Sequence, residues 1–181
     1  MEKYIAILRG INVSGSKMIK MDNLKLSINE LKFRNIESYI QSGNLIFEYA
    51  KTNQQDLANK IMYKIQEAFG FHVPVIVKST EELNTVIANN PFINNRNEAI
   101  DKLHVTFFSE EPEKALQDKL ADNATDSDEF IIDGNMVYLF CPNGYGRTKF
   151  NNNYFEAKLK ISATTRNWKT VIKLAEMANG R

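Results

Sequence analysis

The order in which strands and helices are predicted along the chain limits the fold more than any single motif does. Short apolar stretches bounded by turn residues are typical of strands. The first half of the chain has such stretches at 3–8, 36–41, 45–49 and 73–78. Apolar residues recur at helical spacing after Asp22, an expected N-cap, and again over 53–69, where Gly70 ends the pattern. The first 79 residues therefore follow the order β-α-β-β-α-β.

The same order of elements recurs, in part, in the second half of the chain. A capping-box pattern, Ser79 with Glu82, predicts a helix that ends before Pro91, and a loop is expected over 92–99. Thr164 or Thr165 is the expected N-cap of the last helix. The predicted strands are 103–108, 129–132 and 136–141, and the later helices are 112–120, 151–161 and 165–178. This half reads β-α-β-β-α-α, without a closing strand.

These orders predict an α+β fold made of two tandem ferredoxin-like, or split βαβ, units. The first unit is expected over 1–79 and the second over 103–181, which includes a C-terminal helix after the sheet. A connecting helix and loop are expected over 80–102. Because no low-complexity linker separates the halves, we expect the two units to pack together.

Apolar residues occupy both faces of the predicted first strand. Tyr4, Ala6 and Leu8 point to one face, and Ile5 and Ile7 point to the other. A strand that is apolar on both faces predicts a sheet that is covered on both sides. This pattern disfavours RNA recognition by aromatic stacking on an open sheet face.

Charge is unevenly distributed although the net charge is only +1. Nine acidic residues fall within 110–133: Glu110, Glu111, Glu113, Asp118, Asp122, Asp126, Asp128, Glu129 and Asp133. Residues 143–181 carry eight basic residues and two acidic ones. Two interpretations stay open, namely solvated faces that neutralise each other and a basic C-terminal third that attracts phosphate or nucleic acid.

The chain contains too few cysteine and histidine residues for an internal disulfide or for the usual His/Cys metal sites. The single cysteine, Cys141, excludes an internal disulfide, and with only two histidines we do not expect a His/Cys metal site. An all-carboxylate magnesium site stays open. No stretch is apolar enough to span a membrane and the N-terminus has no signal-peptide pattern, so we expect a cytoplasmic protein with no membrane partner.

The main candidate site combines two polar turns of the first unit. Arg9, Gly10, Asn12 and Lys17 follow the first strand, in a loop that can present backbone N–H groups to an anion. The turn between the second and third strands contains Ser42, Gly43 and Asn44. In a split βαβ unit these two turns lie at the same end of the sheet, so we expect them to be neighbours. The alternative is that both are ordinary turns whose side chains satisfy local backbone groups.

The second unit contributes three further candidate ligand-binding residues. Arg147 and Lys149 lie in a glycine-containing loop before the 151–161 helix. Arg166 is expected in the first turn of the last helix, where the helix dipole disfavours a cation, so we expect a specific anionic partner for it. Trp168 is expected to belong to the hydrophobic core.

Catalytic residues are not identified by the sequence. Cys141 directly precedes Pro142 at a strand end and has no partner at a recognisable spacing. His72 is expected near the same end of the sheet as Arg9, which makes it the one acid–base candidate there. Whether the protein is an enzyme, which cofactor it uses and how it oligomerises are left open.

Four motifs resemble the uncharacterised bacterial family named domain of unknown function 1697. They are YIAILRGINV at 4–13, YIQSGNLIF at 39–47, GYGRTK at 144–149 and ATTRNWKT at 163–170. Ser14 and Thr148 depart mildly from the family pattern. The resemblance implies a two-unit α+β fold and a cytoplasmic location, and it implies no activity, cofactor or catalytic residue. Because the motifs coincide with the polar turns, the resemblance favours a shared site.

The leading hypothesis is a protein that binds an anionic, phosphate-bearing small molecule at the polar end of the first sheet. Arg9 and Lys17 would supply charge, and Arg147, Lys149 and Arg166 would join from the second unit. One alternative is nucleic-acid binding through the basic C-terminal third. Another is a protein-interaction module without a small-molecule site.

Overall fold

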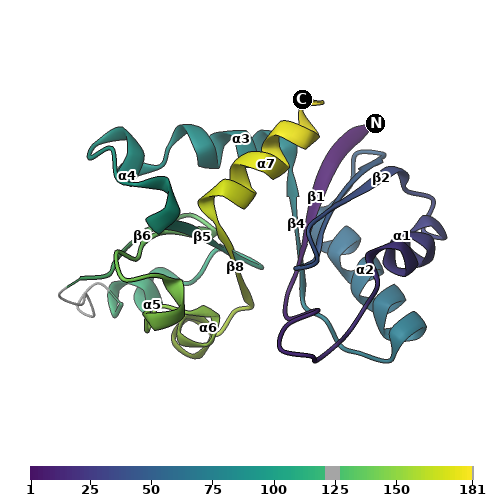
Figure 1. Ribbon diagram of the computed structural model, residues 1–181, viewed down its shortest axis with the longest axis horizontal. Coiled ribbons are helices and arrows are strands. Elements are labelled where there is room, and N and C mark those ends of the chain that lie inside the picture. Colours follow the sequence, from purple (N-terminus) through teal and green to yellow (C-terminus); the bar gives the residue numbers. More distant parts are fainter. Residues whose placement is uncertain (121–126, 181) are drawn as a thin grey trace. The chain divides into compact units, whose positions relative to one another are not determined.

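The computed structural model divides the chain into two compact units, each built around a four-stranded antiparallel sheet (Figure 1). The structure describes residues 1–120 and 127–180. The first unit comprises Met1–Asn84 together with the chain from Lys173 onward, and the second comprises Thr85–Ile172. Three charged residues counted above, Asp122, Asp126 and Arg181, lie outside the described residues.

The first unit has the split βαβ order that the sequence predicts. Its elements are β1 (Glu2–Leu8), α1 (Met21–Asn29), β2 (Arg34–Tyr39), β3 (Asn44–Tyr49), α2 (Gln54–Phe69) and β4 (Val75–Ser79), followed by α3 (Thr80–Ala88). The strands are arranged β2-β3-β1-β4. In the centre β1 pairs antiparallel with β3, so that Ile7 lies opposite Asn44.

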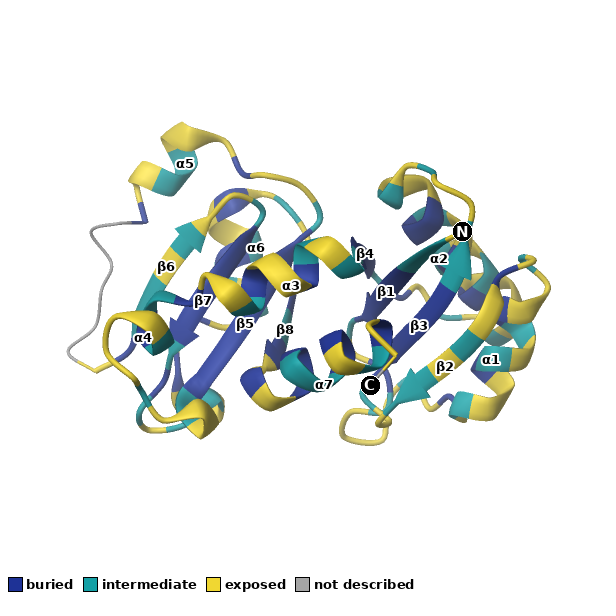
Figure 2. Ribbon diagram, turned by 90° about the horizontal axis from the view of Figure 1, so that it is seen from above, coloured by how far each residue is buried: buried dark blue, intermediate teal, exposed yellow. Residues whose placement is uncertain are grey.

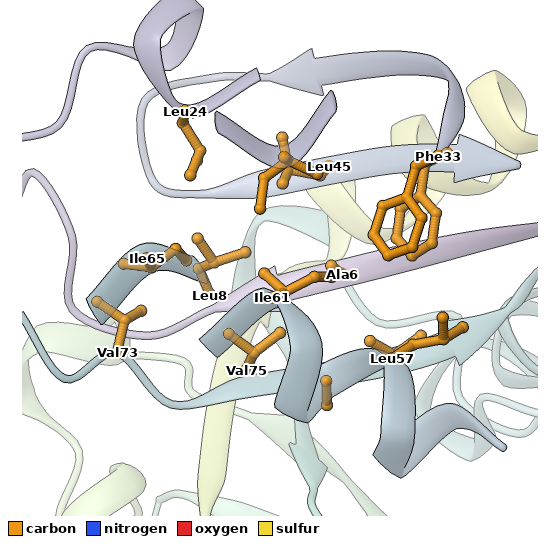
Figure 3. Packing of buried hydrophobic residues seen from close by; sticks show 14 of the residues in the cluster. Ala6, Leu8, Leu24, Phe33, Leu45, Leu57, Ile61, Ile65, Val73 and Val75 are labelled. Carbon is orange, nitrogen blue, oxygen red and sulfur yellow. The ribbon is translucent and has the colours of Figure 1, made fainter. Parts of the chain in front are cut away.

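Both faces of the central strand β1 are buried, as its apolar residues predict, whereas the edge strand β2 is exposed or half-buried along its length (Figure 2). Tyr4, Ala6 and Leu8 join the core cluster that α1 and α2 close over one face (Figure 3). On the opposite face Ile5 and Ile7 are 0% exposed. A buried aliphatic side chain of this size contributes about 1.5–3 kcal/mol of hydrophobic free energy. The centre of the sheet therefore has no open face on which RNA bases could stack.

Local signals place most helix ends of the first unit correctly. Asn53 accepts hydrogen bonds from the amides of α2, and Gly70 ends that helix at φ 74°. The capping box before α3 forms as predicted. Asp22, however, is not an N-cap, because α1 begins at Met21 and Asp22 pairs instead with Lys25 at 3.0 Å.

The second unit contains a closing strand that the sequence analysis misses. Its elements are α4 (Pro91–Asn94), β5 (Leu103–Phe108), α5 (Lys114–Asp118), β6 (Glu129–Asp133), β7 (Met136–Phe140), α6 (Asn152–Leu159), β8 (Ala163–Asn167) and α7 (Trp168–Ala178), with single 3-10 turns at Ile100–Lys102 and Tyr145–Arg147. The sheet order is β6-β7-β5-β8, so this unit is also a complete split βαβ unit. Part of the expected 92–99 loop is the short helix α4, which Asn90 caps.

The prediction that Thr164 or Thr165 caps the last helix is wrong, because both residues lie on β8. Asn167 is the cap, and its Oδ1 accepts a hydrogen bond from the Thr170 amide at 2.8 Å. A threonine pair is compatible with a cap or with a strand. These two threonines form a strand because they pair with β5, which is distant in the sequence.

The two units repeat each other at the level of single positions. Tyr4 of β1 lies opposite Ser79 of β4, and His104 of β5 lies opposite Asn167 of β8. Ser79 and Asn167 both accept a hydrogen bond from the first turn of the helix that follows the fourth strand. Tyr4 and His104 are therefore equivalent positions in the repeat. Within 1–120 and 127–180 no helix combines the length and the apolar character that a membrane crossing requires.

Candidate functional site

The two polar turns of the first unit are neighbours, as the topology predicts. The Leu8 amide donates to the Gly43 carbonyl at 2.8 Å. The side-chain amide of Asn12 donates to the Gln41 carbonyl at 2.9 Å. Arg9, Gly10, Asn12 and Lys17 therefore lie at the same end of the sheet as the turn with Ser42, Gly43 and Asn44.

Asn12 holds this pair of turns together. Its Oδ1 accepts from the Ile19 amide at 2.8 Å, and its Nδ2 donates to the Ile19 carbonyl at 2.9 Å as well as to Gln41. Its backbone is left-handed, with φ 55°, a conformation that asparagine tolerates better than most residues. The side chain uses both amide hydrogens on the protein, so in this structure Asn12 positions the loop.

Gly43 and Asn44 form the inner side of the site. Gly43 has φ +86°, and a Cβ there would lie 2.8 Å from Leu8 Cβ and 2.8 Å from Ile11 Cδ1. The Asn44 side chain is fully buried and donates to the Tyr39 carbonyl at 3.0 Å and to Ser42 Oγ at 3.2 Å. These contacts close the β2–β3 turn and seat it against the β1–α1 loop.

The cationic residues lie on the outer side of the same end. Lys17 Nζ donates to the His72 carbonyl at 2.7 Å, and the Arg9 amide donates to the Pro74 carbonyl at 3.0 Å. The segment that carries His72 is therefore close to both residues, as predicted, and the His72 side chain is exposed. An ammonium group has three donors, so Lys17 can bind His72 and an anion together.

Strained backbone is concentrated on these two turns. Four non-glycine residues there have positive φ: Asn12, Ser14, Lys17 and Ile40. Ile40, at φ 51°, is unusual because β-branched residues are strongly disfavoured in this region. Among the described residues, no protein atom accepts a hydrogen bond from the amides of Gly10, Ser14 or Gly15, whereas Val13 pairs with Ser16 in an isolated antiparallel bridge. The loop thus offers a run of backbone donors beside Lys17.

In the second unit the motifs at 144–149 and 163–170 also meet. The Tyr145 hydroxyl donates to Thr165 Oγ1 at 3.0 Å, and Thr165 Oγ1 donates to Asn152 Oδ1 at 2.7 Å. Thr106 Oγ1 lies 2.7 Å from Thr165 Oγ1. Arg147 is exposed, and Lys149 Nζ lies 5.2 Å from the centre of the Phe150 ring. A participation of Arg147 and Lys149 in the first unit's site stays a prediction.

Arg166 does not lie in the first turn of the last helix, as the sequence analysis expects. It lies on β8 opposite Val105, is 9% exposed, and donates from its guanidinium to the Thr165 carbonyl at 2.9 Å. Burial lowers the pKa of Arg166 to about 10. The helix-dipole argument for an anionic partner therefore does not apply to this residue.

His104 is a buried polar residue that the sequence analysis does not single out. It is 9% exposed and stacks on the Tyr145 ring, with 4.9 Å between ring centres. Its Nδ1 has no hydrogen-bond partner within the described part of the chain. Burial lowers the pKa of His104, against a smaller opposing effect of a hydrogen bond to the Lys102 backbone. Its equivalence to Tyr4 in the internal repeat is the sequence signal that could have identified it.

Neither Cys141 nor a cluster of metal-ligating side chains identifies a catalytic group among the described residues. Cys141 is buried, and burial is the main cause that raises the pKa of its thiol to about 11, so the thiol is protonated at neutral pH. The described residues contain no group of three or more histidine, cysteine or acidic side chains placed to hold a metal ion.

Comparison with known proteins shows the fold and the family. The solved structure of conserved bacterial protein SP0830 from Streptococcus pneumoniae is similar, with a TM-score of 0.74 and 22% sequence identity over 98% of each chain. At that identity the likeness concerns the fold alone. No curated protein matches the chain.

The family profile that matches is the one described as "Protein of unknown function (DUF1697)", and it covers residues 1–138. The turns with Arg9 and Ser42 lie inside the matched segment, and the motifs at 144–149 and 163–170 lie beyond it. The match includes the whole first sheet, the strands β5 and β6, and the first residues of β7. The chain therefore belongs to the DUF1697 family of proteins of unknown function.

Proposed function

We propose that the chain binds a phosphate-bearing small molecule at the loop end of the first sheet, over 9–17 and 41–44. The observation that carries the proposal is the group of backbone amides at Gly10, Ser14 and Gly15 that donate to no described protein atom. Successive backbone N–H groups in such a loop form a concave site for an anion. Membership of a family of unknown function does not indicate which ligand binds.

Charge around the loop has one sign. Residues 9–20 contain Arg9, Lys17 and Lys20 and no acidic residue, and residues 39–44 contain no charged residue. Lys17 Nζ is fixed by the His72 carbonyl at 2.7 Å, with two further N–H groups that a phosphate oxygen can accept from. Charge-assisted hydrogen bonds of this kind are roughly twice as strong as neutral ones.

Backbone strain supports the same location. Residues in sparsely populated φ regions cost about 1–3 kcal/mol each and persist where the surrounding structure holds them, often at ligand sites. Asn12, Ser14 and Lys17 on one turn and Ile40 on the other carry such strain. The bonds of Asn12 to Ile19 and Gln41 fix the loop in this conformation before any ligand arrives.

An amide NMR titration with inorganic phosphate, pyrophosphate and ATP tests the proposal. We expect saturable shifts of the Gly10, Ser14 and Gly15 amides. Arg9→Ala should weaken binding at least about tenfold, because a hydrogen bond to a charged group is worth about 1.5–3 kcal/mol. Arg34→Ala is the matched control, since Arg34 is an exposed arginine on β2. It should leave the affinity unchanged.

Two results would contradict the proposal. One is the absence of shifts in the 10–15 amides with all three probes, and the other is an equal loss of affinity in the two arginine variants. A single-stranded oligonucleotide serves as a further probe. Binding that falls steeply with salt and shifts the 147–173 amides instead would assign the site to the basic C-terminal third.

A further inference from the structure

A cavity of about 350 Å³ lies at the opposite end of the first sheet from the Arg9 loop. Three separate segments line it, namely the start of β1, the β3–α2 connection and the β4–α3 junction. The lining residues are Glu2, Lys3, Tyr4, Lys51, Thr52, Gln54, Ser79, Thr80 and Glu81. The volume falls at the lower end of the range of about 300–1,000 Å³ for small-molecule sites.

Side-chain hydrogen bonds tie the three lining segments to one another. The Tyr4 hydroxyl accepts from the Thr52 amide at 3.3 Å, which joins β1 to the β3–α2 connection. Thr80 Oγ1 donates to the Lys3 carbonyl at 3.2 Å, which joins the β4–α3 junction to β1.

Glu82, which stands behind the lining, supplies the third link. Its Oε2 accepts from Gln54 Nε2 and from the Ser79 amide, so it connects α2 with the β4–α3 junction. Its Oε1 lies 3.5 Å from Nζ of Lys78, which is 3% exposed. A cavity whose walls are cross-linked in this way exists before a ligand binds, which lowers the entropy cost of binding.

The charges in the lining are balanced. Glu2 and Glu81 are acidic, Lys3 and Lys51 are basic, and Thr52, Gln54, Ser79 and Thr80 add uncharged polar groups. The Lys51–Glu2 pair, at 3.6 Å and largely exposed, is a weak surface ion pair that a ligand can replace at little cost. A ligand with a single charge that displaces this pair would contact either Lys51 or Glu2 and leave the other without its partner in the pair.

We infer that the cavity binds a small zwitterion of the size and charge of a free α-amino acid. The ligand carboxylate pairs with Lys51 and the ligand ammonium pairs with Glu2, in place of the ion pair that these two side chains make with each other. This site is separate from the proposed phosphate site, because Glu2–Tyr4 and Arg9 lie at opposite ends of β1. The two sites can therefore be tested independently.

The experiment is an amide NMR titration of the full chain with each of the common L-amino acids, up to roughly ten times a Kd of 1 mM. We expect saturable shifts at Thr52, Gln54, Ser79 and Thr80 for at least one amino acid. For that amino acid, the N-acetyl derivative and the α-amide, which each lack one charge, should bind at least about tenfold more weakly.

Two lysine variants separate a site from a general charge effect. Lys51→Gln should weaken binding several-fold, and it should leave folding intact because the Lys51 side chain is 88% exposed. Lys158→Gln is the matched control, since Lys158 is an exposed lysine on α6. It should change nothing.

Three results would overturn the inference. The first is no shift at the four lining amides with any amino acid, and the second is equal binding of the singly charged derivatives. The third is a set of shifts confined to Gly10 and Gly15, which would assign binding to the Arg9 loop. Failure at the cavity leaves the phosphate titration unaffected, so the two proposals fail separately.

Discussion

The Asn12 side-chain amide and the Gln41 carbonyl meet at 2.9 Å although 29 positions separate the two residues in the sequence. This bond joins the two turns on which the proposed phosphate site rests. It exists because β1 and β3 pair antiparallel at the centre of the sheet, which brings the end of β1 beside the start of β3. The strand topology therefore brings the two turns of the candidate site together, and Asn12 connects them.

Replacing Asn12 should destabilise the fold in two separable ways. Asn12→Gly removes three hydrogen bonds but keeps the φ of 55° accessible, and we expect a loss of about 1–3 kcal/mol. Asn12→Ala adds a left-handed backbone penalty of about 1–2 kcal/mol. Urea unfolding measures both variants. An alanine variant as stable as the glycine variant would show that the left-handed conformation is not maintained.

Substitution by alanine should destabilise the protein to different extents at two glycines that have similar φ angles. Gly43→Ala introduces a Cβ 2.8 Å from Leu8 and Ile11 side-chain atoms, so overpacking adds about 1–3 kcal/mol to the φ penalty. Gly15→Ala has φ +75° and no atom within 4 Å of the new Cβ, so only the φ penalty of about 1–2 kcal/mol applies. Thermal unfolding of both variants checks the order. Equal losses would contradict the close approach at Gly43.

Substitution of Glu82 should lower the stability of the fold more than the loss of a helix cap does. Ser79→Ala removes one hydrogen bond to the first turn of α3, which costs about 1 kcal/mol. Glu82→Ala removes the bonds to Gln54 and Ser79 and also leaves Lys78 buried beside no carboxylate, so we expect a loss of about 3 kcal/mol or more. Urea unfolding compares the two variants. The additional variant Lys78→Met should restore much of the loss in Glu82→Ala.

His104 should make the stability depend on pH on the acidic side of neutrality. Because burial lowers its pKa in the folded state, the unfolded chain binds the proton more readily. The free energy of unfolding should therefore fall as the pH drops below the unfolded value of about 6.5, and His104 should contribute no slope well above it. Urea unfolding between about pH 5 and 8 measures this slope.

The variant His104→Phe should reduce that slope, because it removes the titrating group and keeps a ring that can stack on Tyr145. His72→Gln, which changes the other histidine of the chain, is the control and should keep the slope. A slope that is the same in His104→Phe and in the unmodified protein would assign the effect to other groups.

Local signals predict the parts of the fold that depend on neighbours in sequence. Asn53 and Gly70 bound α2, and the Ser79–Glu82 capping box opens α3, since each of these contacts spans a few residues. The neighbouring turns of the first unit are predicted too, because the order of elements is enough to orient β1 against β3. The ligand-binding roles assigned to those turns stay predictions.

The failures at β8 and at His104 have a common cause in contacts between distant segments. Thr164, Thr165 and Arg166 form a strand because β5 offers a free edge for pairing, and no local pattern announces that partner. The same pairing turns Arg166 from an expected helix-terminal cation into a buried strand residue. His104 is overlooked because its burial depends on β7, β8 and the ring of Tyr145.

The amino-acid sequence alone determined the α+β class, the tandem repeat of elements, the burial of both faces of β1 and the polar character of the two turns, because periodicity and turn chemistry act over short distances. Only the tertiary structure decided that β8 completes the second sheet, that Asn12, Gly43 and Asn44 build the framework of the candidate site, and that a balanced set of charges surrounds a cavity at the far end of β1. These features depend on which distant segments pair. Strand pairing is decided by the burial and hydrogen bonding of the whole sheet.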